Sequence, residues 1–198
     1  MDGMSGSTSF VAKMKDAELL SSEVLVAEPK RFIHEVLRMP DGEVIDWYYV
    51  DTQPSVMVVP VTEDGQVVFV KQYRHNLKRD TLELPAGIVD KGEDIAEAAL
   101  RELAEETGYG LASGATLVPL GTYYSLPSET NKSCNLFLAT PVVRLADPHV
   151  DTVIEKYFDM DVATMPLSGA LLEVDRSIQG LETAAALLLA QRHLAMRG

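Results

Sequence analysis

The chain has 198 residues, of which 46% are hydrophobic and 24% are charged, a composition typical of a folded globular protein rather than a disordered or fibrous one. Its 30 acidic and 17 basic residues give a net charge of −13, which argues against a nucleic-acid partner because phosphate backbones require clustered Lys and Arg. The longest strictly apolar run, Ala184–Ala190, is far shorter than the ~20 residues of a membrane span, so we expect no membrane partner.

Two features of the sequence bear on cellular location. Cys134 is the single cysteine, so no internal disulfide can form, which is consistent with a reducing compartment. The segment Met1–Lys15 is rich in Gly and Ser and has no apolar stretch of signal-peptide length. We therefore expect a cytoplasmic protein.

The residues from Glu23 to Asp51 are expected to form a small antiparallel strand unit. β-branched and aromatic residues predominate there, and the turn sequence Met39-Pro40-Asp41-Gly42 divides them. So small a sheet is only marginally stable alone, so it should pack against its own domain or a second subunit. We assign residues 1–51 to this N-terminal unit, with a role in dimerisation, and residues 52–198 to the main domain.

The remaining elements follow in chain order. A hairpin is predicted from Val56–Val61 and Val67–Val70, because the linking Thr62-Glu63-Asp64-Gly65 contains an Asp-Gly turn signal. Next come a short strand, a helix, two strands and two C-terminal helices. The first of these helices has Asp94 or Gly92 near its start and Gly108 just past its end. The predicted ranges of these elements, in that order, are Leu82–Pro85, Glu93–Thr107, Ala115–Tyr123, Asn135–Val143, Val162–Leu172 and Leu181–Met196. Helices mixed with mostly antiparallel strands indicate an α+β sandwich.

The helix predicted at Glu93–Thr107 carries the residues with the clearest chemistry. At ~100° per residue, Glu102 and Glu106 fall on the apolar stripe of the helix, together with Ile95, Ala98 and Ala99. A Glu-rich helix ordinarily presents a solvated charged face, but here the carboxylates share the apolar side. Because like charges at i and i+4 repel each other, we expect a cation at this position, and hard oxygen ligands favour Mg²⁺ or Mn²⁺.

Residues around these carboxylates are expected to orient them. Glu105 follows Arg101 by four residues, so the two side chains can pair on the helix surface and support the neighbouring carboxylates. The preceding loop Gly87–Glu93 contains two glycines, which permit tight backbone passage beside the start of the helix.

The segment Gly87–Tyr109 resembles the Nudix box. That pattern is Gly, five residues, Glu, seven residues, Arg-Glu, an aliphatic residue, any residue, Glu-Glu, any residue, Gly and a hydrophobic residue, and every position matches. From background residue frequencies, its seven fixed letters would coincide at a given start about once in 10⁸–10⁹ trials, so chance does not account for the match.

The resemblance implies a Nudix α/β/α sandwich with a mixed sheet, and hydrolysis of a nucleoside diphosphate linked to another moiety. The metal-binding carboxylates it implies are Glu102, Glu105 and Glu106. Arg101 would hold these carboxylates in place, so Arg101 and Glu105 count as catalytic residues as well. Gly87 and Glu93 would be supporting residues of the box.

Segments outside the box resemble those of ADP-ribose pyrophosphatases and related nucleotide-sugar hydrolases. Val70–Arg74 and Leu82–Gly87 look like the stretches that precede the box in that group, and Gly180–Ala190 resembles its closing helix. By this resemblance the backbone carbonyl of Ala86 is a metal ligand, and Arg74 contacts substrate phosphate.

The loop Leu126–Lys132 departs from that subgroup. The relatives usually carry Pro-Gly about sixteen residues after the box, whereas this chain has Pro127-Ser128 slightly further on. Family members have a mobile acidic loop here, and Glu129 is the only carboxylate of this one, so Glu129 is the candidate general base. The alternative is that Glu129 is a solvated surface residue.

Two further features have competing interpretations. Trp47, the only tryptophan, matches in position an aromatic residue that stacks on the base in ADP-ribose hydrolases, but it is equally compatible with core packing. A basic cluster stands out in the acidic chain and consists of Lys71, Arg74, His75, Lys78 and Arg79. We expect a function for Arg74 alone, and the other four residues are expected to lie in a solvated loop.

Two functions from different classes follow. The first is Mg²⁺-dependent hydrolysis of a nucleoside diphosphate sugar, with ADP-ribose favoured over GDP-mannose or a dinucleotide. The second is a non-catalytic nucleotide-sugar sensor, which has no need to retain Glu102, Glu105 and Glu106 together. The three carboxylates therefore favour the enzyme, and the resemblance implies a homodimer in which the N-terminal unit contributes to the partner's substrate site.

Overall fold

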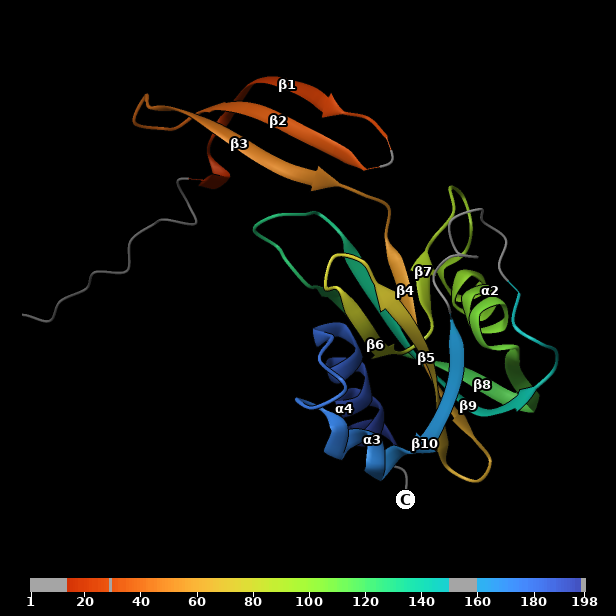
Figure 1. Ribbon diagram of the computed structural model, residues 1–198. Coiled ribbons are helices and arrows are strands. Elements are labelled where there is room, and N and C mark those ends of the chain that lie inside the picture. Colours follow the sequence, from red (N-terminus) through yellow and green to blue (C-terminus); the bar gives the residue numbers. More distant parts are fainter. Residues whose placement is uncertain (1–13, 29, 150–159, 197–198) are drawn as a thin grey trace, which may run out of the picture. The chain divides into compact units, whose positions relative to one another are not determined.

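The computed structural model describes residues 14–28, 30–149 and 160–196. The chain forms two compact units, Met1–Thr52 with Leu126–Asn131, and Gln53–Ser125 with Lys132–Gly198. We call them the N-terminal unit and the main unit (Figure 1). Within the described ranges, no helix is both long and apolar enough to cross a membrane.

The N-terminal unit is a three-stranded antiparallel sheet in the order β1-β2-β3. Its strands are β1 (Glu18–Val26), β2 (Arg31–Arg38) and β3 (Val44–Asp51). The turn predicted between the last two is confirmed, since the Gly42 N–H donates to the Met39 carbonyl at 2.9 Å and Gly42 adopts φ +91°. The sheet begins earlier in the sequence than the predicted Glu23.

The segment Leu126–Asn131 belongs to this unit because it bonds to the end of β3. The Val50 N–H donates to the Glu129 carbonyl at 2.9 Å, and the Thr130 hydroxyl donates to the Val50 carbonyl at 2.9 Å. The Asn131 side chain accepts from the Thr52 N–H at 3.0 Å and donates to Asp51 at 2.6 Å. The loop therefore satisfies polar groups at the end of β3 that a three-stranded sheet alone leaves unpaired.

The main unit contains a seven-stranded mixed sheet with the path β10-β5-β4-β9-β8, to which β6 adds beside β5 and β7 beside β4. β4 and β9 run parallel, whereas the other recorded pairs are antiparallel. The strands are β4 (Ser55–Thr62), β5 (Gln66–Arg74), β6 (Arg79–Glu83), β7 (Ala86–Ile88), β8 (Tyr109–Tyr124), β9 (Ser133–Arg144) and β10 (Asp161–Pro166).

Helices cover both faces of this sheet because its central strands are apolar on both sides. In β4, Val56 and Val58 pack in the core cluster that contains residues of α2 (Ile95–Thr107). Met57, Val59 and Val61 pack in the opposite cluster, with residues of α3 (Leu167–Glu173) and α4 (Leu181–Ala195). Alternation along a strand sends successive side chains to opposite faces, so two hydrophobic layers form. The predicted Nudix α/β/α sandwich with its mixed sheet and small antiparallel sheet is confirmed (Figure 1).

Most predicted elements of the main unit are present with adjusted ends. The β4–β5 hairpin turns at Gly65, which has φ +80° and donates to the Thr62 carbonyl at 3.0 Å. Asp94, one of the two predicted starts, is the N-cap of α2, and Gly108 ends that helix in the left-handed conformation. Both strands after it are longer than predicted, and α4 matches its predicted range closely.

Two predicted elements near helices and turns were wrong in part. The helix expected at Val162–Leu172 is a strand, β10, followed by α3 from Leu167. Val162 packs in one core cluster and Ala163 and Met165 in the other, so this segment lies as an edge strand against β5. The strand expected at Leu82–Pro85 instead ends at Glu83, and β7 begins at Ala86.

Candidate active site

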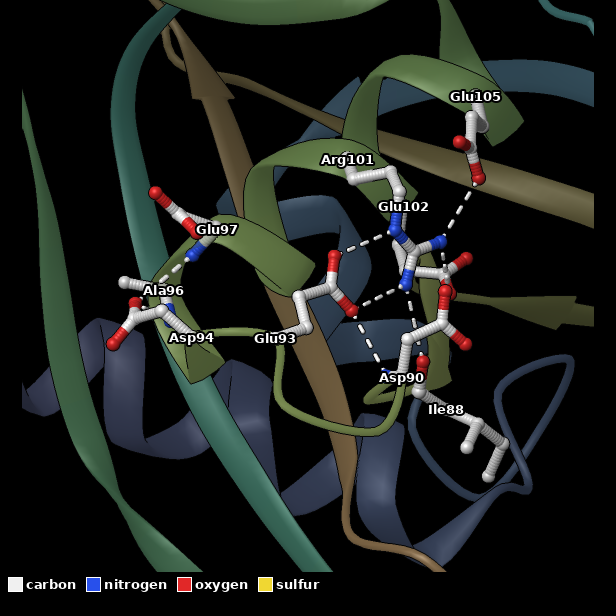
Figure 2. Close-up of polar contacts among 9 residues, drawn as sticks. All are labelled: Ile88, Asp90, Glu93, Asp94, Ala96, Glu97, Arg101, Glu102 and Glu105. Carbon is white, nitrogen blue, oxygen red and sulfur yellow. Dashed lines mark hydrogen bonds and ion pairs between the residues drawn. The ribbon is translucent and has the colours of Figure 1, made fainter.

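Helix α2 holds the carboxylates in fixed spacing because both of its ends are capped. The Asp94 side chain accepts from the backbone N–H groups of Ala96 at 2.8 Å and Glu97 at 3.2 Å (Figure 2). At the other end the Gly108 N–H donates to the Ala104 carbonyl at 2.8 Å with φ 72°. Capping satisfies backbone groups that a helix end leaves open, so the helix forms over this range and no further.

Arg101 connects the glycine loop to the helix carboxylates (Figure 2). Its Nε and Nη2 donate to the two oxygens of Glu93 at 2.8 and 3.0 Å, and Nη2 also donates to the Ile88 carbonyl at 3.1 Å. Its Nη1 donates to Glu102 at 2.9 Å and to Glu105 at 3.1 Å. The predicted contact between Arg101 and Glu105 is therefore confirmed, and the same guanidinium also orients Glu93 and Glu102.

Glu93 is the ionised partner of this arginine. The Arg101 guanidinium and the Asp90 N–H, at 2.9 Å, both donate to its carboxylate and lower the pKa of Glu93 to about 2. The hydrogen bond to Glu93, followed by those to Glu102 and Glu105, raises the pKa of Arg101 above its ordinary value. The pair remains charged across the physiological range and ties the loop to the helix.

Gly87 makes room for the carboxylate of Glu102. A Cβ atom added at Gly87 would lie 1.9 Å from Oε1 and 2.0 Å from Cδ of Glu102. The carboxylate therefore rests directly over the Gly87 backbone, and any side chain there would displace it. This close approach explains why the loop has a glycine at this position.

Glu106 is a buried carboxylate of the helix whose pKa is strongly raised. Burial raises the pKa of Glu106 to about 8, and the charge of Glu102 adds to the effect, although the Ala86 N–H opposes it by donating to Oε2 at 3.0 Å. Glu106 thus carries a proton near neutral pH unless a cation compensates its charge.

The predicted apolar stripe is right for the buried Ala98 and Ala99 but wrong for Ile95, which is 39% exposed at the first turn.

Glu83, which the sequence interpretation missed, lies in the same electrostatic environment. Its carboxylate accepts from Arg74 Nε at 2.8 Å, from Arg74 Nη2 and from the Thr81 hydroxyl at 2.6 Å. The charge of Glu83 raises the pKa of Glu106, whereas that of Arg74 lowers it. The one signal in the sequence was an acidic residue between Leu82 and Leu84, which is unusual in an apolar strand.

The donor groups suit a hard divalent cation. Among the described residues, no three His, Cys, Asp or Glu side chains are gathered as a ready metal centre, and Arg101 engages an oxygen of both Glu102 and Glu105. The pKa of the buried Glu106 stays raised even though the charge of Arg74 opposes the shift, and a cation with oxygen ligands would provide the further positive charge that the ionised carboxylate needs. Carboxylate oxygens are the ligands that Mg²⁺ and Mn²⁺ prefer.

The two remaining predicted site residues, Trp47 and Glu129, belong to the N-terminal unit. Trp47 is 38% exposed, so it is not a core residue. It lines a cavity of about 220 Å³ within this unit, together with Tyr49, Pro127, Ser128, Thr130 and Asn131. Glu129 is exposed and stands in the chain between the lining residues Ser128 and Thr130, and its backbone bonds to Val50 and Leu126 fix the loop that carries it.

Comparisons with known proteins agree with this geometry. The family model described as the NUDIX domain matches residues 51–168. An ADP-ribose pyrophosphatase of Mycobacterium tuberculosis is 31% identical over 163 residues, which cover 81% of this chain and 76% of that protein. An ADP-ribose pyrophosphatase of Bacillus subtilis is 36% identical over 105 residues, covering 53% of this chain and 55% of that protein. The chain thus matches about half the length of the Bacillus relative.

A solved structure described as an ADP compounds hydrolase has the same fold. It superposes with a TM-score of 0.78 at 22% identity and covers 92% of this chain and 96% of its own. The family model spans the glycine loop, the capped helix α2 and the Arg101 contacts described above. The chain belongs to the NUDIX domain family.

Proposed function

We propose that the protein hydrolyses the diphosphate bond of a nucleoside diphosphate sugar, with ADP-ribose as the favoured substrate. Water would add to one phosphorus and the bridging oxygen would leave, giving a nucleoside monophosphate and a sugar phosphate. The observation that carries the proposal is the set of Glu102, Glu105 and Glu106 on one helix, in which Arg101 donates to Glu102 and Glu105 and the Ala86 N–H donates to Glu106. A non-catalytic sensor has no need of that set.

The proposal assigns a divalent cation, Mg²⁺ with Mn²⁺ as the alternative, to these carboxylates. Glu102, Glu105, Glu106 and the Ala86 carbonyl would hold it, and the burial of Glu106, whose ionised form needs a positive partner, supports this choice. When bound, the cation supplies positive charge that polarises the phosphate oxygens. Arg101 keeps Glu102 and Glu105 in one orientation through the contacts of Figure 2, so that these two carboxylates need not reorganise during the reaction.

Other residues would bind and activate the reactants. Arg74, held by Glu83 in a two-point contact, would donate to substrate phosphate. Glu129 would accept the proton of the attacking water, and its exposed position on an ordered loop supports this role. Trp47 would stack on the base in the cavity that it lines.

The proposal includes a cytoplasmic homodimer to which the N-terminal unit contributes. That sheet exposes many large apolar side chains, which supports burial against a second copy, namely Leu19, Leu20, Val24, Leu25, Val26, Phe32 and Val44. GDP-mannose and dinucleotides remain the alternative substrates of the same reaction.

A side-by-side assay tests the substrate class. We expect a higher kcat/KM with Mg²⁺ for ADP-ribose than for GDP-mannose, and for both than for ATP or dGTP. Preferential cleavage of the nucleoside triphosphates would reject the class.

The base site has its own test in Trp47→Ala. Loss of the ring should raise the KM for ADP-ribose by about tenfold and leave kcat nearly unchanged, because stacking binds substrate and transition state alike. An unchanged KM would remove the stacking role from Trp47.

A further inference from the structure

Two arginines lie opposite each other at the outer end of the β5–β6 hairpin. The register pairs Val70 with Glu83, Gln72 with Thr81, and Arg74 with Arg79. Directly opposed residues of antiparallel strands share a face, and so do alternate residues along each strand. The hydrogen bonds that Glu83 accepts from Arg74 and Thr81 agree with this arrangement. The face therefore has a carboxylate at its inner end and two guanidinium groups at its outer end.

The charges on this face do not balance. Arg74 is paired with Glu83, but Arg79 donates to the side-chain oxygen of Gln179, which is neutral. In the part of the chain that the structure describes, no carboxylate forms an ion pair with Arg79. Like charges directly opposite each other in a sheet are unfavourable, so the second arginine costs stability that an anion would restore.

The inner end of the same face adjoins the carboxylates of the candidate active site. Both Arg74 and Glu83 are close enough to Glu106 to shift its pKa, and Ala86, three residues after Glu83, donates to the Glu106 carboxylate. A phosphate bridged to Glu106 by a cation would therefore lie near Arg74, and Arg79 is directly opposite Arg74 in the hairpin.

Arg79 is also held in place before any ligand binds. Gln179 stands two residues before the first residue of α4, so its contact with Arg79 ties the hairpin to the segment that leads into that helix. A guanidinium fixed in this way loses less conformational freedom on binding, and its planar array of donors matches phosphate oxygens.

We propose that Arg79 is a specificity residue that binds the second phosphate of the substrate's diphosphate, the one farther from Glu106, and that Gln179 is its positioning residue. This assignment rests on the proposed function for the identity of the ligand. Arg79 would make the site selective for two linked phosphates over one, since a single phosphate near Glu106 and Arg74 makes no contact with Arg79.

Calorimetric binding of inorganic pyrophosphate and of inorganic phosphate in the presence of Mg²⁺ tests the assignment. Arg79→Gln should weaken the Kd of pyrophosphate about tenfold, the size of one charge-assisted hydrogen bond, and leave the Kd of phosphate unchanged. Arg79→Lys keeps the positive charge but loses the planar donor array of the guanidinium, so its pyrophosphate affinity should lie between those of wild type and Arg79→Gln. Gln179→Ala should weaken pyrophosphate less than Arg79→Gln does.

The matched control is Lys71→Gln. Lys71 lies on the opposite face of β5, where it pairs with Asp80 at 3.1 Å, so this variant removes the same charge from the same hairpin. Pyrophosphate affinity should equal that of wild type. Equal affinities in Arg79→Gln and Lys71→Gln, an equal loss for phosphate and pyrophosphate, or no binding of pyrophosphate by wild type would each overturn the assignment.

Turnover separates this assignment from the proposed function. Failure of wild type to hydrolyse ADP-ribose would reject the proposed substrate, whereas the pyrophosphate comparison would still decide the role of Arg79. If wild type does hydrolyse ADP-ribose, Arg79→Gln should raise its KM by a similar factor with little change in kcat. A contact that only anchors the hairpin would lower the thermal midpoint in Arg79→Gln and Gln179→Ala and leave KM unchanged.

Discussion

At the scale of single residues, the site depends on how closely a few groups approach one another. The carboxylate of Glu102 rests over Gly87, and the guanidinium of Arg101 contacts Glu93, Glu102 and Glu105 at 2.8–3.1 Å. Helical spacing predicted the pairing of Arg101 with Glu105, whereas the contact of Arg101 with Glu93 and the approach of Glu102 to Gly87 depend on how the loop folds against the helix. Glu83 was missed, and Arg79 was assigned to a solvated loop, because their neighbours come from strand register and from the segment before α4, which local sequence does not encode.

Gly87→Ala tests the close approach. The new Cβ would overlap Glu102 Oε1 and force the carboxylate to move, so we predict a loss in kcat of about 100-fold, the usual effect of a displacement of ~1 Å. The backbone of Gly87 is not in the left-handed region, so the thermal midpoint should change little.

Gly92→Ala is the informative comparison for this variant. Gly92 belongs to the same loop but has φ +86° and open space around its Cβ position. Gly92→Ala should lower the thermal midpoint and keep the wild-type kcat, which is the reverse of the result expected for Gly87→Ala. Wild-type activity in Gly87→Ala would contradict the geometry described here.

At the scale of elements, hydrophobic period and turn chemistry predicted most of the main unit. The β4–β5 hairpin and the capped α2 have strong local signals at Gly65, Asp94 and Gly108. The segment Asp161–Pro166 has no such signal, and short apolar segments fit a helix or a strand equally well. Pairing with β5 decides its structure, which is a tertiary effect.

The N-terminal sheet has a pH-sensitive contact at His34. Its two ring nitrogens lie 2.8 Å from Glu23 on β1 and 2.7 Å from Asp46 on β3, and its ring stacks on Tyr48 at 4.5 Å. Hydrogen bonds to Glu23 and then Asp46 raise the pKa of His34 above 6.5. The stabilisation is therefore complete below pH ~6.5 and is lost as the pH rises through the higher pKa of the folded protein.

Urea unfolding followed by Trp47 fluorescence measures this effect, because Trp47 is the only tryptophan and lies in the same sheet. We predict that the midpoint falls as the pH rises above ~6.5 and that His34→Gln flattens this dependence. An unchanged slope in His34→Gln would assign the pH dependence to other groups.

At the scale of the whole molecule, the apolar surface of the N-terminal sheet is the main evidence for assembly. We predict a mass of twice the 21.7 kDa chain by light scattering at working concentration. Leu25→Glu, which places a charge at a residue of β1 that is 52% exposed, should shift the protein toward monomer. Leu172→Glu, at an exposed position in α3, should leave the mass unchanged, and a monomeric wild type would contradict the dimer.

The central claim is that Glu102, Glu105 and Glu106 form a catalytic cation site, and Glu106→Gln tests it most directly. The measurement is ADP-ribose hydrolysis against Mg²⁺ concentration, together with the thermal midpoint of the metal-free protein. Removing a ligand charge should lower kcat by about 100-fold or more. Because the pKa of Glu106 is raised to about 8, its ionisation costs stability as the pH rises from ~4.5 toward 8, so the midpoint of the variant above pH 8 should hold or rise. Wild-type rates in Glu106→Gln at saturating Mg²⁺ would contradict the account.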